Sequence, residues 1–171
     1  MATAAAAELD PGAQRPRWFS SDGSGRFDLA EPGAPATWRR SPSAPLVEVG
    51  ARLAYIDRGE VSRRSLASLR VPRALRLAGV VSPLAAGGAS ARCSAGAHYE
   101  RDSHPWARRF AEGGFDGIRY GLSHEPGLRL LGVAIFGDAG EQPGFGPVED
   151  GPIPEALVEE AVARFGFRYA P

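Results

Sequence analysis

Three positions in this sequence combine a reactive side chain with a local setting in which that side chain could act on a ligand. The first is Arg26, which follows Gly25 at the end of the turn-rich stretch Ser-Ser-Asp-Gly-Ser-Gly. A guanidinium at the exit of such a turn can clamp a phosphate or a carboxylate through paired hydrogen bonds. The plainer alternative is a surface arginine in a loop.

The second position is Glu48, which lies inside the apolar stretch Leu-Val-Glu-Val. On a helix, Glu48 would stand one step round from the apolar stripe of Leu46, Val49 and Leu53, near the edge of the buried face. Partial loss of hydration there would poise the carboxylate beside a cationic substrate. The alternative is an ordinary glutamate on a solvated face.

The third position is the Ser123-His124-Glu125 stretch, in the loop that follows Tyr120. A hydroxyl and an imidazole in such a loop can donate and accept hydrogen bonds from a ligand. The alternative is a polar turn that does no more than join two strands.

Other arrangements of reactive residues are missing from the sequence. Cys93 is the single cysteine, and His98 and His104 stand at irregular distances from it, so we expect neither a metal site nor an internal disulfide. The sequence contains no nucleophile elbow, no P-loop and no glycine-rich dinucleotide fingerprint. The arginine pairs 63–64 and 108–109 are expected on helices, either on solvated faces or as partners of carboxylates.

Composition describes an ordinary folded protein. The chain has 171 residues, of which 43% are hydrophobic and 23% charged. Its 20 cations, all arginines, balance 20 acidic residues, which argues against a protein built to hold a nucleic-acid backbone. No apolar run approaches the roughly 20 residues of a membrane helix, and no signal peptide is recognised. We therefore expect a cytoplasmic protein without a membrane partner.

The elements that must position these residues alternate irregularly between helix and strand. We expect a flexible segment over residues 1–16 and one domain over residues 17–171. Helices are predicted over residues 42–55, 62–69, 105–112 and 154–165. Strands are predicted over residues 26–29, 37–38, 75–81, 115–120, 130–136 and 167–169. The absence of a regular βαβ series favours an α+β fold.

The order of three segments resembles the RES domain family of bacterial toxins. Residues 25–32, 41–49 and 114–124 resemble the family segments that carry an arginine, a glutamate and a serine, the residues that give the family its name. The Phe-Asp-Gly-Ile-Arg-Tyr stretch at 115–120 is the strongest part. The resemblance extends over about Trp18 to Gly137.

The resemblance implies an ADP-ribosyltransferase-like fold, with a split, mostly antiparallel β core and helices around an NAD cleft. It also implies a toxin that cleaves the nicotinamide–ribose bond of NAD, by phosphorolysis or hydrolysis, or that transfers ADP-ribose. NAD would be the substrate, no metal would be needed, and a cognate antitoxin would be the protein partner. Nucleic acid would enter only as an acceptor of ADP-ribose.

Residue by residue, the resemblance implies that Arg26 binds the dinucleotide, that Glu48 is the catalytic carboxylate and that Ser123 holds the nicotinamide side or a ribose. Thr37 falls at a cofactor-binding position where family members usually carry tyrosine. This departure favours an alternative function, a catalytically weakened module that binds a nucleotide or a protein. Transfer of ADP-ribose to a macromolecule is a further alternative.

Overall fold

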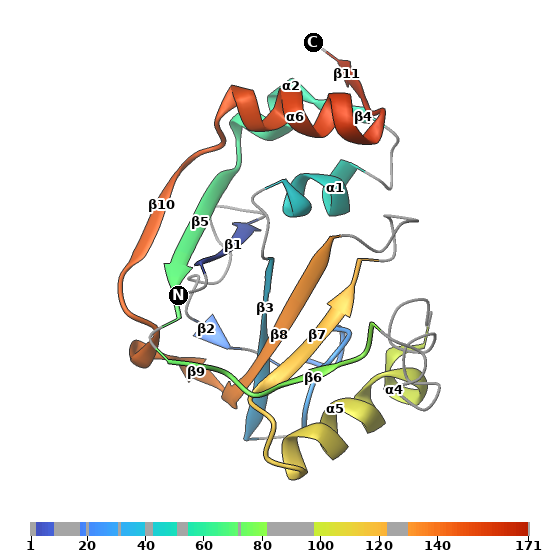
Figure 1. Ribbon diagram of the computed structural model, residues 1–171, viewed down its shortest axis with the longest axis vertical. Helices are drawn as coiled ribbons and strands as arrows, with labels where there is room; N and C mark the ends of the chain where they lie inside the picture. Colours follow the sequence, from blue (N-terminus) through green and yellow to red (C-terminus); the bar gives the residue numbers. More distant parts are fainter. Residues whose placement is uncertain are drawn as a thin grey trace.

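In the computed structural model, seven strands form one sheet in the order β10-β5-β1-β3-β8-β7-β6 (Figure 1). The structure describes residues 3–8, 18–19, 21–30, 32–39, 43–50, 55–71, 73–81, 98–122 and 130–170. Neighbouring strands of the sheet run antiparallel, except for the parallel pair β6 and β7. The strands of the sheet are β1 (Thr3–Glu8), β3 (Gly33–Arg39), β5 (Ser65–Arg70), β6 (Leu77–Gly79), β7 (Gly117–Gly121), β8 (Leu131–Asp138) and β10 (Val148–Pro152).

Two short strand pairs stand outside this sheet. One joins β4 (Tyr55–Asp57) to β11 (Arg168–Ala170) in parallel, and the other joins β2 (Trp18–Phe19) to β9 (Gly140–Glu141) in antiparallel orientation. Each pair links a segment from the first third of the chain to one from its last third.

The helices gather at two ends of the sheet (Figure 1). One group is α1 (Ala44–Gly50), α2 (Arg58–Ser62) and α6 (Glu155–Phe165), and the other is α4 (Tyr99–Asp102) and α5 (His104–Glu112). A short 3-10 turn covers Pro143–Phe145. Local sequence sets these bounds: Pro105 lies in the first turn of α5, and Gly166, with a φ of 70°, ends α6 in the left-handed conformation that glycine tolerates best.

The two faces of the sheet carry different apolar clusters. Ile118 and Tyr120 of β7 share one face with Ala134 of β8, and Val133 and Ile135 lie on the other. The first cluster also includes buried residues of the loop after β2, of α1 and of α5, namely Phe27, Ala44, Val47 and Ala107. Burial of a large apolar side chain contributes about 1.5–3 kcal/mol, so this cluster fixes the loop and both helices against one sheet face.

The architecture confirms the predicted α+β fold with a mostly antiparallel core. The strands predicted over 115–120 and 130–136 are the neighbours β7 and β8, and the helices predicted over 105–112 and 154–165 are α5 and α6. These segments carry both a clear apolar period and a proline or glycine boundary, which is why local sequence suffices there.

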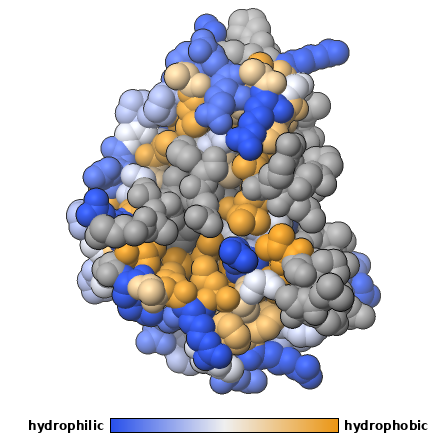
Figure 2. Space-filling view, in the orientation of Figure 1, coloured by the Kyte–Doolittle hydropathy of each residue, from blue (hydrophilic) through white to orange (hydrophobic). Residues whose placement is uncertain are grey.

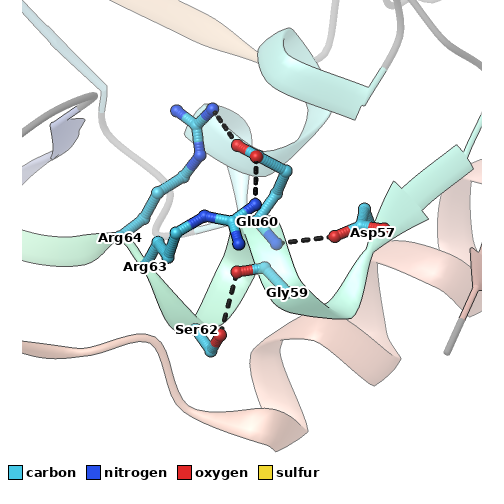
Figure 3. A network of polar contacts seen from close by, with 6 residues as sticks. All are labelled: Asp57, Gly59, Glu60, Ser62, Arg63 and Arg64. Carbon is cyan, nitrogen blue, oxygen red and sulfur yellow. Dashed lines mark hydrogen bonds and ion pairs between the residues drawn. The ribbon is translucent and has the colours of Figure 1, made fainter.

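The helix predicted over 62–69 is wrong. Residues 65–70 form β5, where Ala67 and Leu69 are buried at the two-residue period of a strand. The helix in this region lies earlier and is short: the carboxylate of Asp57 accepts the N–H of Glu60 at 2.7 Å and caps α2 (Figure 3). Pairing with β1 and β10 on both sides outweighs the helical preference of leucine and alanine.

Two further predictions differ from the structure. The strand predicted over 26–29 is an irregular turn, and the helix predicted over 42–55 is described only for Ala44–Gly50, with Tyr55 already in β4. Of the segment predicted to be flexible, residues 3–8 form β1, paired with β5 over six positions. The predicted boundary at residue 17 lies outside the described residues.

Candidate active site

The loop that carries Arg26 is held in place by the carboxylate of Asp28, a residue of the same loop. Phe27 is buried at 2% exposure, and the buried Asp28 accepts the N–H of Gly23 at 2.8 Å and of Gly25 at 3.1 Å. A Cβ at position 25 would lie 2.3 Å from Oδ1 of Asp28, so only glycine fits there. These contacts give the backbone that leads into Arg26 a defined path.

Earlier in the same loop, the side chain of Asp22 holds Ser24 through two hydrogen bonds. Its carboxylate accepts the hydroxyl of Ser24 at 2.6 Å and the N–H of Ser24 at 2.8 Å. These hydrogen bonds, the one from the hydroxyl most of all, lower the pKa of Asp22 below its ordinary value.

The guanidinium of Arg26 lies beside two aromatic rings. Its Cζ is 5.5 Å from the ring centroid of Tyr120 and 5.8 Å from that of Tyr99. Its Nη1 is buried and has no hydrogen-bond partner among the described residues. Attraction to the ring faces offsets part of the lost hydration of the cation, but an unpaired buried N–H still costs about 1–3 kcal/mol. An anionic ligand would remove that cost.

The ring of Tyr120 is held in place by close packing against its neighbours. It packs against Phe27 at 4.8 Å between centroids, and a Cβ at position 132 would lie 2.4 Å from its Cζ. Gly132 therefore leaves the space that allows the Tyr120 ring to lie across β8. Tyr120 is 2% exposed, so its ring is buried and held in a fixed place beside the Arg26 guanidinium.

Thr37 lies on the same sheet face as Tyr120. In the register, Thr37 of β3 pairs with Ala134 of β8, and Ala134 pairs with Ile118 of β7, two residues before Tyr120 on the same face. Thr37 is exposed, whereas Ile118, Tyr120 and Ala134 on the same face are buried. The sheet thus brings two of the predicted site residues, Arg26 and Thr37, to one face. Figure 2 shows apolar surface in the region where Figure 1 places β7 and β8.

Glu48 belongs to α1, the helix that packs on this same face. Ala44 and Val47 of α1 join the buried cluster of Phe27 and Tyr120, and position 48 lies one turn after Ala44. The backbone therefore brings α1 to the Arg26 face of the sheet; the Glu48 side chain lies outside the described part.

Ser123 lies outside the described residues as well. Leu122, directly before it, donates its N–H to the carbonyl of Leu130 at 3.1 Å, so β7 leads from Tyr120 straight toward position 123. The predicted role of Ser123 stays a prediction.

Four residues of the site were not singled out from the sequence. Tyr99 and Tyr120 contact the guanidinium of Arg26, and Ser103 and His104 contact the loop backbone. The stretch from Tyr99 to His104 offered a signal: it places tyrosine, serine and histidine directly before a helix-starting proline.

The described residues form neither a metal-binding cluster nor a membrane-spanning helix. Among them, no group of three histidine, cysteine, aspartate or glutamate residues is arranged to hold a metal ion. None of the described helices combines the length and the apolar composition needed to cross a bilayer.

The sequence matches no protein-family model and no curated protein. The fold, by contrast, has a counterpart among solved structures. It is similar to a chain in the crystal structure of the M. tuberculosis MbcT–MbcA toxin–antitoxin complex, with a TM-score of 0.65. The similarity covers 95% of this chain and 89% of that chain, at 14% sequence identity. At this identity the likeness concerns the fold alone.

Proposed function

We propose that this chain is the toxin of a toxin–antitoxin pair and that it is an enzyme that cleaves the nicotinamide–ribose bond of NAD. The observation that carries the proposal is the buried, unpaired Nη1 of Arg26, whose guanidinium lies beside the rings of Tyr99 and Tyr120. The toxin fold and the resemblance to the RES domain family support it independently of that geometry.

The reaction needs a negative charge beside the sugar and a positive charge beside the phosphates. As the bond from ribose C1′ to the nicotinamide nitrogen breaks, its electron pair leaves with nicotinamide, and positive charge develops on the ribose. An oxygen of phosphate or of water then bonds to C1′, and attacking water gives up a proton. Glu48 on α1 stabilises the cation, and Arg26 anchors the pyrophosphate.

The remaining predicted residues bind rather than react. Thr37, exposed on the sheet face of Tyr120, offers a hydroxyl to a ribose or an amide. Ser123 holds the nicotinamide side or a ribose. The rings of Tyr99 and Tyr120 keep Arg26 in place.

Release of free nicotinamide from NAD tests this function. The purified protein is incubated with NAD, once with phosphate and once in a phosphate-free buffer, and nicotinamide is quantified by chromatography. Phosphate-dependent release indicates phosphorolysis, and release in both buffers indicates hydrolysis. Protein that binds no NAD and releases no nicotinamide contradicts the proposal.

A second candidate function is a module with this fold that binds a nucleotide or a protein without catalysis. Thr37 favours it, because the resemblance places tyrosine at this position. The same assay separates the two: the module binds NAD in calorimetry but releases no nicotinamide. Transfer of ADP-ribose to a protein or nucleic acid would appear instead as label from NAD on the acceptor.

A cognate antitoxin and a cytoplasmic location complete the proposal. The fold neighbour was crystallised in a toxin–antitoxin complex, which supports a small protein partner here. If the pairing is right, expression of this chain alone arrests growth, and co-expression of the partner encoded beside it restores growth.

A further inference from the structure

The junction between α4 and α5 reaches the backbone of the Arg26 loop from a distant part of the chain. Ser103 donates its hydroxyl to the carbonyl of Arg26, and Nε2 of His104 lies 2.8 Å from the carbonyl of Gly25. Because a carbonyl oxygen can only accept, Nε2 of His104 carries the hydrogen. Two successive peptide groups, those of Gly25 and Arg26, are thus held by two successive side chains.

We infer that Ser103 and His104 are positioning residues, which set the place of the Arg26 guanidinium by fixing the two carbonyls beside it. Ser103 is fully buried, at 0% exposure, so water does not replace its hydroxyl at the Arg26 carbonyl. The Gly25 carbonyl otherwise accepts only the N–H of Asp28, at 3.4 Å, among the bonds that the described residues show. Without His104, the Gly25–Arg26 peptide would lose its stronger anchor.

The same junction also supplies one of the rings beside Arg26. Tyr99 begins α4, four residues before Ser103, and accepts the N–H of Ser103 through its carbonyl at 2.9 Å. One rigid turn therefore holds the Arg26 backbone through Ser103 and His104 and faces its guanidinium with Tyr99. Losing the backbone anchors should move the guanidinium relative to this ring.

The expected consequence for catalysis rests on the proposed function. A guanidinium that is already in place loses little freedom when the pyrophosphate binds, so affinity depends on its position before binding. Loss of the anchors should weaken NAD binding with much less effect on the reaction rate at saturation, because neither residue contacts the reacting atoms in this account.

The first test reads the position of Arg26 without NAD. In NMR spectra, the ring faces of Tyr99 and Tyr120 should shift the Arg26 side-chain protons upfield. We expect His104→Leu to reduce that shift and His104→Gln, which keeps a donor near the Nε2 position, to restore most of it. His98→Leu, at an exposed histidine before α4, is the matched control and should leave the shift unchanged. An unchanged shift in His104→Leu overturns the inference.

The second test is a double-mutant cycle on NAD affinity. We expect His104→Leu alone to raise the Kd for NAD about tenfold, and to have almost no effect in an Arg26→Ala background. Equal effects in both backgrounds would mean that His104 acts on general stability and would contradict the inference. If the wild-type protein binds no NAD, the proposed function fails, while the NMR experiment still decides the positioning role.

Discussion

Arg26 shows how the site depends on individual atoms. Its Nη1 is buried without a partner among the described residues, and Gly25 and Gly132 leave room for the loop carboxylate and for the Tyr120 ring. An added methyl group at either glycine would overlap a side chain of the site.

We expect Arg26→Ala to weaken NAD binding by about 10- to 100-fold, since hydrogen bonds to a charged group contribute about 1.5–3 kcal/mol. Arg26→Lys keeps the charge but loses the planar pair of donors, so its Kd for NAD should lie between that of the wild type and that of Arg26→Ala. Arg108→Ala, at an exposed position on α5, is the control. Calorimetry with NAD measures all three, and a wild-type Kd in Arg26→Ala would refute the assigned role.

Gly132→Ala should destabilise the fold by about 1–3 kcal/mol, because its Cβ would overlap the Tyr120 ring. Gly151→Ala is the matched control: Gly151 also lies in a strand, and a Cβ there would meet nothing within 4 Å. Urea unfolding followed by tryptophan fluorescence gives both free energies of unfolding. Equal values for the two variants would show that Tyr120 is not held as described.

Only part of the site could be predicted from residue types. Arg26 follows a glycine-rich turn, a local pattern that needs no knowledge of the fold. Tyr99 contributes through a contact across 73 positions of sequence (99 minus 26), and the residues around Tyr99 do not indicate that Arg26 is its partner. Contacts of this kind depend on the sheet register and on α4, which local patterns do not determine.

Elements that carry a clear period and a boundary residue were predictable, and elements shaped by their neighbours were not. The short helix α2 depends on polar contacts: Asp57 caps it, the hydroxyl of Ser62 donates to the carbonyl of Gly59 at 2.8 Å, and Glu60 pairs with Arg63 and Arg64 (Figure 3). These contacts stabilise α2, which ends at Ser62, three residues before β5 begins and inside the segment predicted as one helix.

Asp116 joins the connection before β6 to the start of β7. Its carboxylate accepts Nη2 of Arg73 at 2.7 Å and the N–H of Arg76 at 2.7 Å. The hydrogen bond from Arg73, followed by that from Arg76, holds the pKa of Asp116 below its ordinary value of 3.8. A carboxyl with a lowered pKa in the folded state stabilises the fold above its unfolded pKa, and that stabilisation is lost as pH falls through the folded pKa.

Asp116→Asn should therefore lower the free energy of unfolding by about 1–2 kcal/mol near neutral pH, and the difference from wild type should shrink below about pH 4. Urea titrations at several pH values measure it. Asp150→Asn, at an exposed position on β10, is the control and should change little. A difference of the same size at about pH 3 would contradict this account.

For the molecule as a whole, the sheet order explains how distant segments reach one face of the sheet. The loop of Arg26, the strand of Thr37, the helix of Glu48 and the strand before Ser123 come from separate parts of the chain, and β3, β8 and β7 lie side by side beneath them. The fold class followed from the mixture of elements, but the place of β1 between β3 and β5 did not, because an alanine-rich terminal segment carries no strand period.

The most direct measurement of the central claim is nicotinamide release from NAD by three proteins: wild type, Glu48→Gln and Glu159→Gln. The Glu48 substitution removes the charge and keeps the shape, while Glu159 is an exposed glutamate on α6 and serves as the control. The account predicts release by wild type and Glu159→Gln, and a rate lower by about 10²–10³-fold for Glu48→Gln. Full release by Glu48→Gln would contradict it.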